Sequence, residues 1–196
     1  MRAKDLMSTP AVTVAPGTPA KAALAVLAAH GFTALPVVEG DRLVGLVTEA
    51  DLLRGRVVAD PRTPHGVPPE PGWTVGEVMR ADTLRVAPGA DVATAARVML
   101  EHGVRSVPVA DGDRLVGVLT YRDLLRVLAR DDLDILADVR HRLAAYGGSG
   151  RWEVSVADGA VTVLDEHDDA TDRHVARVLV ESVPGVQAVR VSARPA

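Results

Sequence analysis

The chain has 196 residues with a formal net charge of −4, and 47% of its residues are apolar. It contains no cysteine, which excludes disulfides, thiolate nucleophiles and cysteine-bound metals. An acidic chain with only 3% aromatic residues is a poor nucleic-acid binder, because such binders rely on basic patches and stacking side chains. The first ten residues lack the apolar run of a signal peptide, and no 18-residue apolar stretch follows. We therefore expect a cytoplasmic protein without a membrane span.

The first two thirds of the chain contain an internal duplication. Residues 4–54 align with residues 76–126 at a constant offset of 72 without a gap, and 22 of 51 positions are identical. Each copy predicts a short extended segment, a Pro-Gly turn, a helix, two strands joined by a Gly-Asp turn, and a short helix. The fold class is therefore α+β. We expect two pseudo-symmetric β-α-β-β-α repeats packed sheet to sheet.

Several local signals position the elements of each copy. In the first copy the extended segment is residues 12–14, and Ala23, Val26 and Leu27 share one face of the helix that follows. Gly31 ends that helix, because glycine readily adopts the left-handed conformation found after a helix C-terminus. The same signals recur 72 residues later, so both copies should fold alike.

Each copy ends in the pattern Gly-h-h-Thr-x-x-Asp, where h is apolar. The threonine, Thr48 or Thr120, ends a strand and opens a helix, and Asp51 or Asp123 follows three residues later. One interpretation is a capping box, in which hydroxyl and carboxylate satisfy free backbone N–H groups. The alternative is a nucleotide site, in which the hydroxyl and the helix N-terminus bind a phosphate and the carboxylate accepts from two ribose hydroxyls. The glycine would then let a ligand approach the strand.

Residues 4–130 resemble a tandem pair of cystathionine-β-synthase (CBS) domains, a Bateman module. The resemblance rests on Leu-Pro-Val at 35–37 and Gly-Leu-Val-Thr-Glu-Ala-Asp at 45–51, and on their partners at 107–109 and 117–123. It implies that the cleft between the repeats binds an adenosyl ligand such as AMP, ADP, ATP or S-adenosylmethionine. It also implies a homodimer formed through the short helices with paired leucines, Leu52-Leu53 and Leu124-Leu125.

The resemblance assigns roles to individual residues. Asp51 and Asp123 would bind the ribose, and Thr48 and Thr120 would meet the phosphates. Basic residues at two positions of the second copy, Arg105 and Arg122, would also meet phosphate. We therefore expect the phosphorylated ligand near Asp123, and weaker binding or a less charged adenosyl compound near Asp51. The apolar residues that would sandwich the adenine, or would simply form the core, are Val14, Leu35, Val47, Val86, Val107 and Leu119.

A proline-rich connector separates the copies. Residues 56–72 hold five prolines, which neither continue a helix nor fit inside a sheet. We therefore place the first CBS repeat at 1–58, the linker at 59–73 and the second repeat at 74–130.

The tail has a different pattern. Ile135, Val139 and Leu143 share a helical face, and alternating apolar residues from Trp152 predict a strand that turns at Asp158-Gly159 into a second strand. A helix and a final strand follow, giving the order α-β-β-α-β over residues 134–196. The segments VSVADGAVTVL and VPGVQAVRV resemble a BON domain, although Asp165-Glu166 stands where that family often has glycine.

The BON resemblance implies contact with phospholipid surfaces or with proteins. Residues 1–130 have a net charge of +1 and residues 131–196 a net charge of −5. Anionic lipid repels an acidic domain, so we expect a protein contact rather than a membrane. His167 and His174 lie near several carboxylates, but a solvated acidic face explains them better than a metal site.

These features favour a regulatory protein over an enzyme. The sequence has no P-loop, no His-Glu-x-x-His and no Gly-x-Ser-x-Gly motif, and we expect neither catalytic residues nor a bound metal. The hypothesis is a sensor that binds an adenine nucleotide between the CBS repeats and signals to an unknown protein partner through the BON-like domain. The alternatives are a scaffold with ligand-free CBS repeats and a BON-mediated association with membrane surfaces.

Overall fold

The computed structural model describes residues 1–54, 72–167 and 169–194. These residues divide into two compact units, Arg2–Tyr121 and Arg122–Ala196, which are described separately below. Most of the connector at 59–73 lies outside the described residues. No helix within the described ranges is long and apolar enough to cross a membrane.

The first unit contains both copies of the duplication except residues 122–126, which belong to the second unit. Its helices and strands are α1 (Ala3–Leu6), α2 (Ala20–His30), β1 (Ala34–Glu39), β2 (Arg42–Thr48), α3 (Glu49–Leu53), α4 (Val75–Val78), α5 (Val92–Glu101), β3 (Ser106–Asp111) and β4 (Arg114–Thr120), followed by α6 (Tyr121–Leu128), which leads into the second unit. The predicted order of helices and strands is confirmed in both copies. The predicted extended segments are present as single parallel bridges, Val14 to Val37 and Val86 to Val109.

Helix α2 illustrates how the sequence sets these elements. Ala23 and Leu27 are buried and Val26 packs against the core, as their spacing predicts. Gly31 has φ 63° and its N–H donates to the carbonyl of Leu27, so the helix ends at the predicted glycine. Helix α5 ends slightly earlier, at Glu101, and Gly103 then adopts the left-handed conformation.

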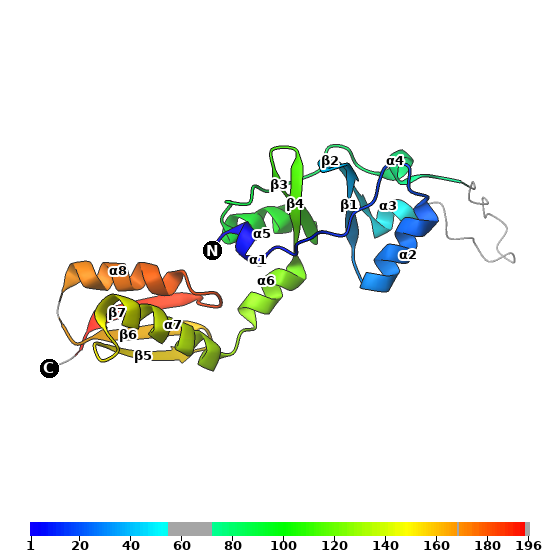
Figure 1. The fold of residues 1–196 in the computed structure, drawn as a ribbon. Coiled ribbons are helices and arrows are strands. Elements are labelled where there is room, and N and C mark those ends of the chain that lie inside the picture. The colour runs from blue at the N-terminus through cyan, green and yellow to red at the C-terminus, as the bar shows by residue number, and fades with distance from the viewer. Residues whose placement is uncertain (55–71, 168, 195–196) are drawn as a thin grey trace, which may run out of the picture. The chain divides into compact units, whose positions relative to one another are not determined.

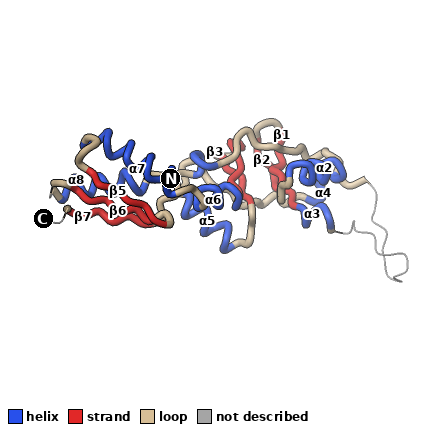
Figure 2. Tube along the Cα trace, turned by 90° about the horizontal axis from the view of Figure 1, so that it is seen from below, coloured by secondary structure: helices blue, strands red, loops and turns tan. Residues whose placement is uncertain are grey.

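The two hairpins meet along β2 and β4. Each hairpin is antiparallel, and the four strands follow the order β1-β2-β4-β3. Only Arg42 and Arg114 pair between β2 and β4, so the link between the hairpins is narrow. The strands lie between α2, α3 and α4 on one side and α5 on the other (Figures 1 and 2). Packing of the repeats sheet to sheet stays a prediction.

Each copy lends its first helix to the other copy. Residues of α1 bond to the second copy, with Ala3 N–H donating to Ala90 at 2.8 Å, and Ser8 then pairs with Val118 of β4. In the same way, Val75 N–H at the start of α4 donates to Thr18 of the first copy at 2.8 Å. Sequence periodicity gives no sign of this exchange. It matters for function because it places residues of the second copy beside the Thr-x-x-Asp motif of the first.

The second unit has the predicted order α-β-β-α-β. Its elements after α6 are α7 (Asp132–Gly147), β5 (Trp152–Ala157), β6 (Ala160–Asp165), α8 (Ala170–Glu181) and β7 (Ala188–Ala193). Strand β6 is central, antiparallel to β5 and parallel to β7. Helix α7 packs on β5, α8 packs on β7, and the two helices pack on each other, so both cover one face of the sheet (Figure 1). Ile135, Val139 and Leu143 are buried in this core, as predicted.

Candidate functional site

The first Thr-x-x-Asp motif forms a capping box. Thr48 is the N-cap of α3, and its hydroxyl oxygen accepts from the Asp51 N–H at 3.2 Å. In return, Asp51 Oδ2 accepts from the Thr48 N–H at 3.1 Å and from its hydroxyl at 2.6 Å. The structural interpretation of the motif is therefore confirmed for the first copy. It does not exclude the ligand-binding one, because the other carboxylate oxygen faces a different partner.

That partner is Arg80, a residue of the second copy. Arg80 Nε and Nη2 donate to Asp51 Oδ1 at 3.3 and 3.2 Å. The Asp51 side chain is 7% exposed, whereas the Arg80 side chain is 62% exposed. A nearly buried carboxylate is thus covered by a cation that reaches in from solvent.

The surroundings of Asp51 keep it ionised. Burial by itself raises the pKa of this carboxyl. The hydrogen bonds from Thr48 and the charge and hydrogen bonds of Arg80 act in the opposite direction and prevail, so the pKa of Asp51 lies below its ordinary value. Asp51 is therefore an acceptor of hydrogen bonds near neutral pH, as recognition of ribose hydroxyls requires.

Gly45 brings Arg80 to this position. The backbone of Arg80 pairs with Leu46 through two hydrogen bonds of 2.9 and 3.0 Å. A Cβ on Gly45 would lie 2.8 Å from the Arg80 carbonyl oxygen and 2.9 Å from Met79 Sδ, closer than real Cβ contacts. Gly117 has the same relation to Met7 and Ser8. The hypothesis that these glycines make room for a ligand is therefore wrong, because protein backbone fills that room.

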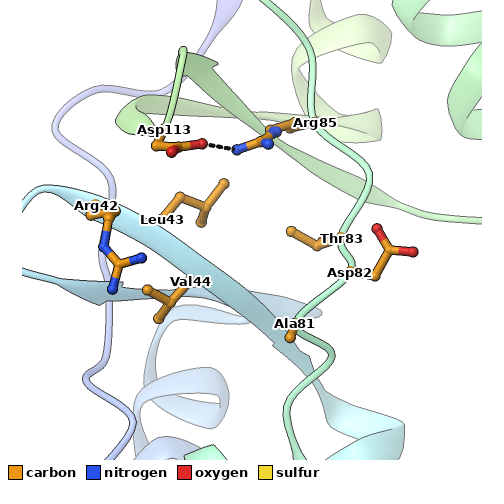
Figure 3. Close-up of a pocket in the computed structure, with 8 residues that line it drawn as sticks. All are labelled: Arg42, Leu43, Val44, Ala81, Asp82, Thr83, Arg85 and Asp113. Carbon is orange, nitrogen blue, oxygen red and sulfur yellow. Dashed lines mark hydrogen bonds and ion pairs between the residues drawn. The ribbon is translucent and has the colours of Figure 1, made fainter.

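A polar pocket continues along the same seam, which we define as the line where β2 faces residues 80–85. It has a volume of about 240 Å³ and is lined by Arg42, Leu43, Val44, Ala81, Asp82, Thr83, Arg85 and Asp113 (Figure 3). Arg85 donates to the Asp113 carboxylate at 2.8 Å. Asp51 and Arg80 are not among its lining residues, although Ala81 follows Arg80 directly in the chain. Ligand pockets span roughly 300–1,000 Å³, so this pocket is smaller than a typical one.

The second motif shares some of these features. Asp123 is buried, and Arg126 on the same helix lies 3.5 Å from its Oδ1. Beside the second motif, Ser8 of the first copy takes the position that Arg80 has beside the first motif. Ser8 pairs with Val118 of β4 as Arg80 pairs with Leu46 of β2. The two copies thus differ in the side chain that the exchanged segment supplies.

The other predicted site residues fall into two groups. Leu35, Val47, Val107 and Leu119 are fully buried, Val14 is buried in the same core as Leu35, and Val86 is partly exposed. Their contact with adenine stays a prediction. Arg105 and Arg122 are exposed. The Arg105 carbonyl accepts from the Tyr121 N–H at 3.0 Å, which places this residue beside the start of α6.

Sequence reasoning missed Arg80. Its one signal is the alignment of the two copies, in which Arg80 stands opposite Ser8. The alignment alone does not show that Arg80 lies beside Asp51, because this requires knowing that α4 packs on the first copy.

Comparison with known proteins places these features in a family. The chain has two repeats, each with a Thr-x-x-Asp motif at the end of a hairpin. A family model described as "CBS domain" matches residues 3–57 and 75–130, more than half of the chain. The chain belongs to the CBS domain family. Both matches end before the second unit's sheet, so they do not show the predicted BON-like domain.

Individual relatives agree with this assignment. CBS domain-containing protein YhcV of Bacillus subtilis is 32% identical over 121 residues, 62% of this chain and 81% of the relative. An A-adding tRNA nucleotidyltransferase of Geobacter sulfurreducens is 33% identical over 126 residues, which are 64% of this chain but 13% of that enzyme. CBS-pair proteins are typically regulatory, although some of these pairs are parts of enzymes.

Two solved structures resemble the first unit and carry ligands. CBSX2 in complex with AMP is 29% identical, with a TM-score of 0.53, and the match covers 64% of this chain and 93% of that one. The CBS domain pair of MJ0100, in complex with 5′-methylthioadenosine and S-adenosyl-L-methionine, is 25% identical with a TM-score of 0.53, covering 65% and 94%. Structural neighbours therefore bind adenosyl compounds.

Proposed function

We propose that this protein is a regulatory sensor that binds an adenine nucleotide or a related adenosyl ligand between its CBS repeats. The observation that carries the proposal is Asp51, an ionised and nearly buried acceptor that pairs with Arg80 of the other copy. The AMP complex of CBSX2 and the S-adenosylmethionine complex of the MJ0100 pair support the ligand class. The ribose would bind Asp51 and Asp123, with Thr48, Thr120 and the exposed Arg105 and Arg122 nearer the phosphates.

The test is calorimetry of AMP, ATP and S-adenosylmethionine on the full chain. We expect at least one of them to bind, and Asp51→Ala or Asp123→Ala to weaken it about tenfold or more, since a charged acceptor of the ribose is lost. Because each substitution also removes a helix-capping group, circular dichroism must show that the variants remain folded. Glu101→Ala, which alters an exposed carboxylate on α5, is the matched control. If neither aspartate variant changes affinity, both carboxylates are only helix caps.

We further propose that the second unit contacts a protein partner and passes on the ligand state. Among the described residues, no helix of this unit packs on one face of its three-stranded sheet, where Glu153, Ser155, Ala160 and Arg190 are exposed. The net charge of −5 over residues 131–196 favours a protein over anionic lipid. A ligand passes its state on only if its affinity differs between two conformations of the protein.

A homodimer through the short CBS helices is the third part of the proposal. Of the leucine pair in α3, Leu52 is fully buried and Leu53 is 49% exposed, while Leu125 of α6 is 63% exposed. Exposed leucines on short helices are available for a partner surface. We expect light scattering to give a dimer at micromolar concentration, and Leu53→Asp or Leu125→Asp to shift it toward monomer. Leu133→Asp, at an exposed leucine of α7, should leave the dimer intact. If light scattering shows that the wild-type protein is a monomer, this part of the proposal is wrong.

A further inference from the structure

The Arg80 side chain occupies the acceptor that the proposed ligand needs. A carboxylate offers about four lone-pair positions for hydrogen bonds. In Asp51, two donors from Thr48 reach Oδ2 and two donors from Arg80 reach Oδ1. A ribose hydroxyl that donates to Asp51 must therefore replace one of these groups.

Of the two partners, Arg80 is the one that can leave. The Thr48 bonds belong to the capping box that opens α3, so breaking them would disturb the helix start. The Arg80 side chain is 62% exposed, so its guanidinium can move into solvent when a donor from a ligand takes its place on the nearly buried Asp51 carboxylate. Its backbone is held by Leu46, so the side chain can swing away while the main chain stays in place.

Resting on the proposed function, we infer that Arg80 is a latch that makes the Asp51 site selective for phosphorylated adenosyl ligands. Every ribose must open the latch to reach Asp51. A ligand with a phosphate gives the released guanidinium a new anionic partner, which arginine binds through two parallel hydrogen bonds. A ligand without phosphate breaks the Arg80–Asp51 ion pair and offers the guanidinium no new anionic partner. The latch therefore lowers the affinity for adenosine more than the affinity for AMP.

The internal repeat supplies a comparison within the same chain. Ser8 takes the place of Arg80 on β4 and has no cation to swing. Arg126, on the same helix as Asp123, lies 3.5 Å from its Oδ1. The exchanged segment therefore supplies an arginine to the first copy's site and a serine at the matching position of the second. Arg80 would give the Asp51 site a phosphate-binding side chain of its own, which reverses the expectation from sequence that this site prefers a less charged ligand.

The experiment is calorimetry of AMP and of adenosine on the full chain, with Asp123→Asn present throughout so that the Asp51 site dominates. For Arg80→Ala we expect adenosine to bind several-fold more tightly and AMP about tenfold more weakly, so that discrimination between the two falls by more than tenfold. Arg80→Lys keeps the charge without the two-pronged geometry and should lie between wild type and Arg80→Ala. Arg97→Ala, which removes an equally exposed and ion-paired arginine from α5, should leave discrimination unchanged.

Each outcome decides between the inferences. Binding of adenosine by Arg80→Ala but not by the parent would support the latch, as would the loss of discrimination. Equal changes in both affinities, or the same effect in Arg97→Ala, would overturn the latch and leave the proposed function standing. If neither compound binds any variant, the latch is wrong. If AMP, ATP and S-adenosylmethionine also fail to bind the chain with Asp123 intact, the proposed function is wrong as well.

Discussion

Replacing Asp165 by alanine should destabilise the second unit by about 3 kcal/mol, because it leaves a largely buried arginine without its main partner. Asp165 is fully buried at the end of β6. Its two oxygens accept from Arg151 Nε at 2.8 Å and Nη2 at 3.0 Å, and Oδ1 also accepts from the His167 N–H at 3.1 Å. Arg151 keeps one further partner, Asp172 at 2.6 Å, so the expected loss is at the lower end for broken buried pairs.

Hydrogen exchange of the β6 amides, measured at increasing urea concentrations, gives the free energy of unfolding of the second unit itself. The control is Glu153→Ala on the neighbouring strand, whose pair with Arg194 spans 3.8 Å with both side chains mostly exposed. We expect this control to cost less than about 0.5 kcal/mol. Equal costs for the two variants would show that the Asp165 pair adds no more than a surface ion pair.

The same carboxylate gives the second unit a defined acid sensitivity. Burial raises the pKa of Asp165, but the hydrogen bonds and charge of Arg151 and the His167 N–H outweigh it, so the folded pKa lies below the ordinary value. A lowered pKa contributes stability above the unfolded value of about 3.9, and this contribution is lost as pH falls through the folded value. The difference between wild type and Asp165→Ala should therefore shrink below about pH 4.

Replacing Gly45 by valine should destabilise the first unit by about 2–3 kcal/mol. The first carbon of the new side chain would overlap the Arg80 carbonyl at 2.8 Å and Met79 Sδ at 2.9 Å. The carbonyl is held by the Leu46 N–H at 3.0 Å, so it moves only at the expense of that bond. Moving the segment would also draw Arg80 away from Asp51.

Chemical denaturation monitored by circular dichroism measures this loss. Gly17→Ala is the matched control, because a Cβ at Gly17 meets nothing within 4 Å and Gly17 does not need a left-handed backbone. We expect the control to be neutral within about 0.5 kcal/mol. A neutral Gly45→Val would mean that the exchanged segment yields easily, and that Arg80 is less firmly placed than the hydrogen bonds indicate.

Helices, helix ends and strands could be predicted from the sequence, because they follow from local periodic patterns. The apolar spacing of Ala23, Val26 and Leu27 places the core face of α2, and Gly31 ends that helix as expected. The alternation from Trp152 onward similarly predicts β5 and β6, because side chains of a half-buried strand point to opposite faces in turn.

What depends on tertiary arrangement could not be predicted. Arg80 and Asp51 are 29 residues apart and meet only because α4 lies on the other copy. Gly45 suggested space for a ligand, since a missing side chain in a strand signals close approach without saying what approaches. Asp165 stood out as a departure from the BON pattern, but its role requires the β5–β6 register that sets its strand opposite Trp152, beside Arg151.

The exchange of α1 and α4 between the copies bears on how such a protein arose. A lone repeat would have its strand glycine uncovered, because the segment that packs there comes from the other copy. Two separate polypeptides would satisfy this need by trading the segment reciprocally, as in a domain-swapped pair. Fusing two such genes would turn a concentration-dependent association into a permanent one within a single chain. It would also free the two halves to diverge, and the contrast between Arg80 and Ser8 is one such divergence.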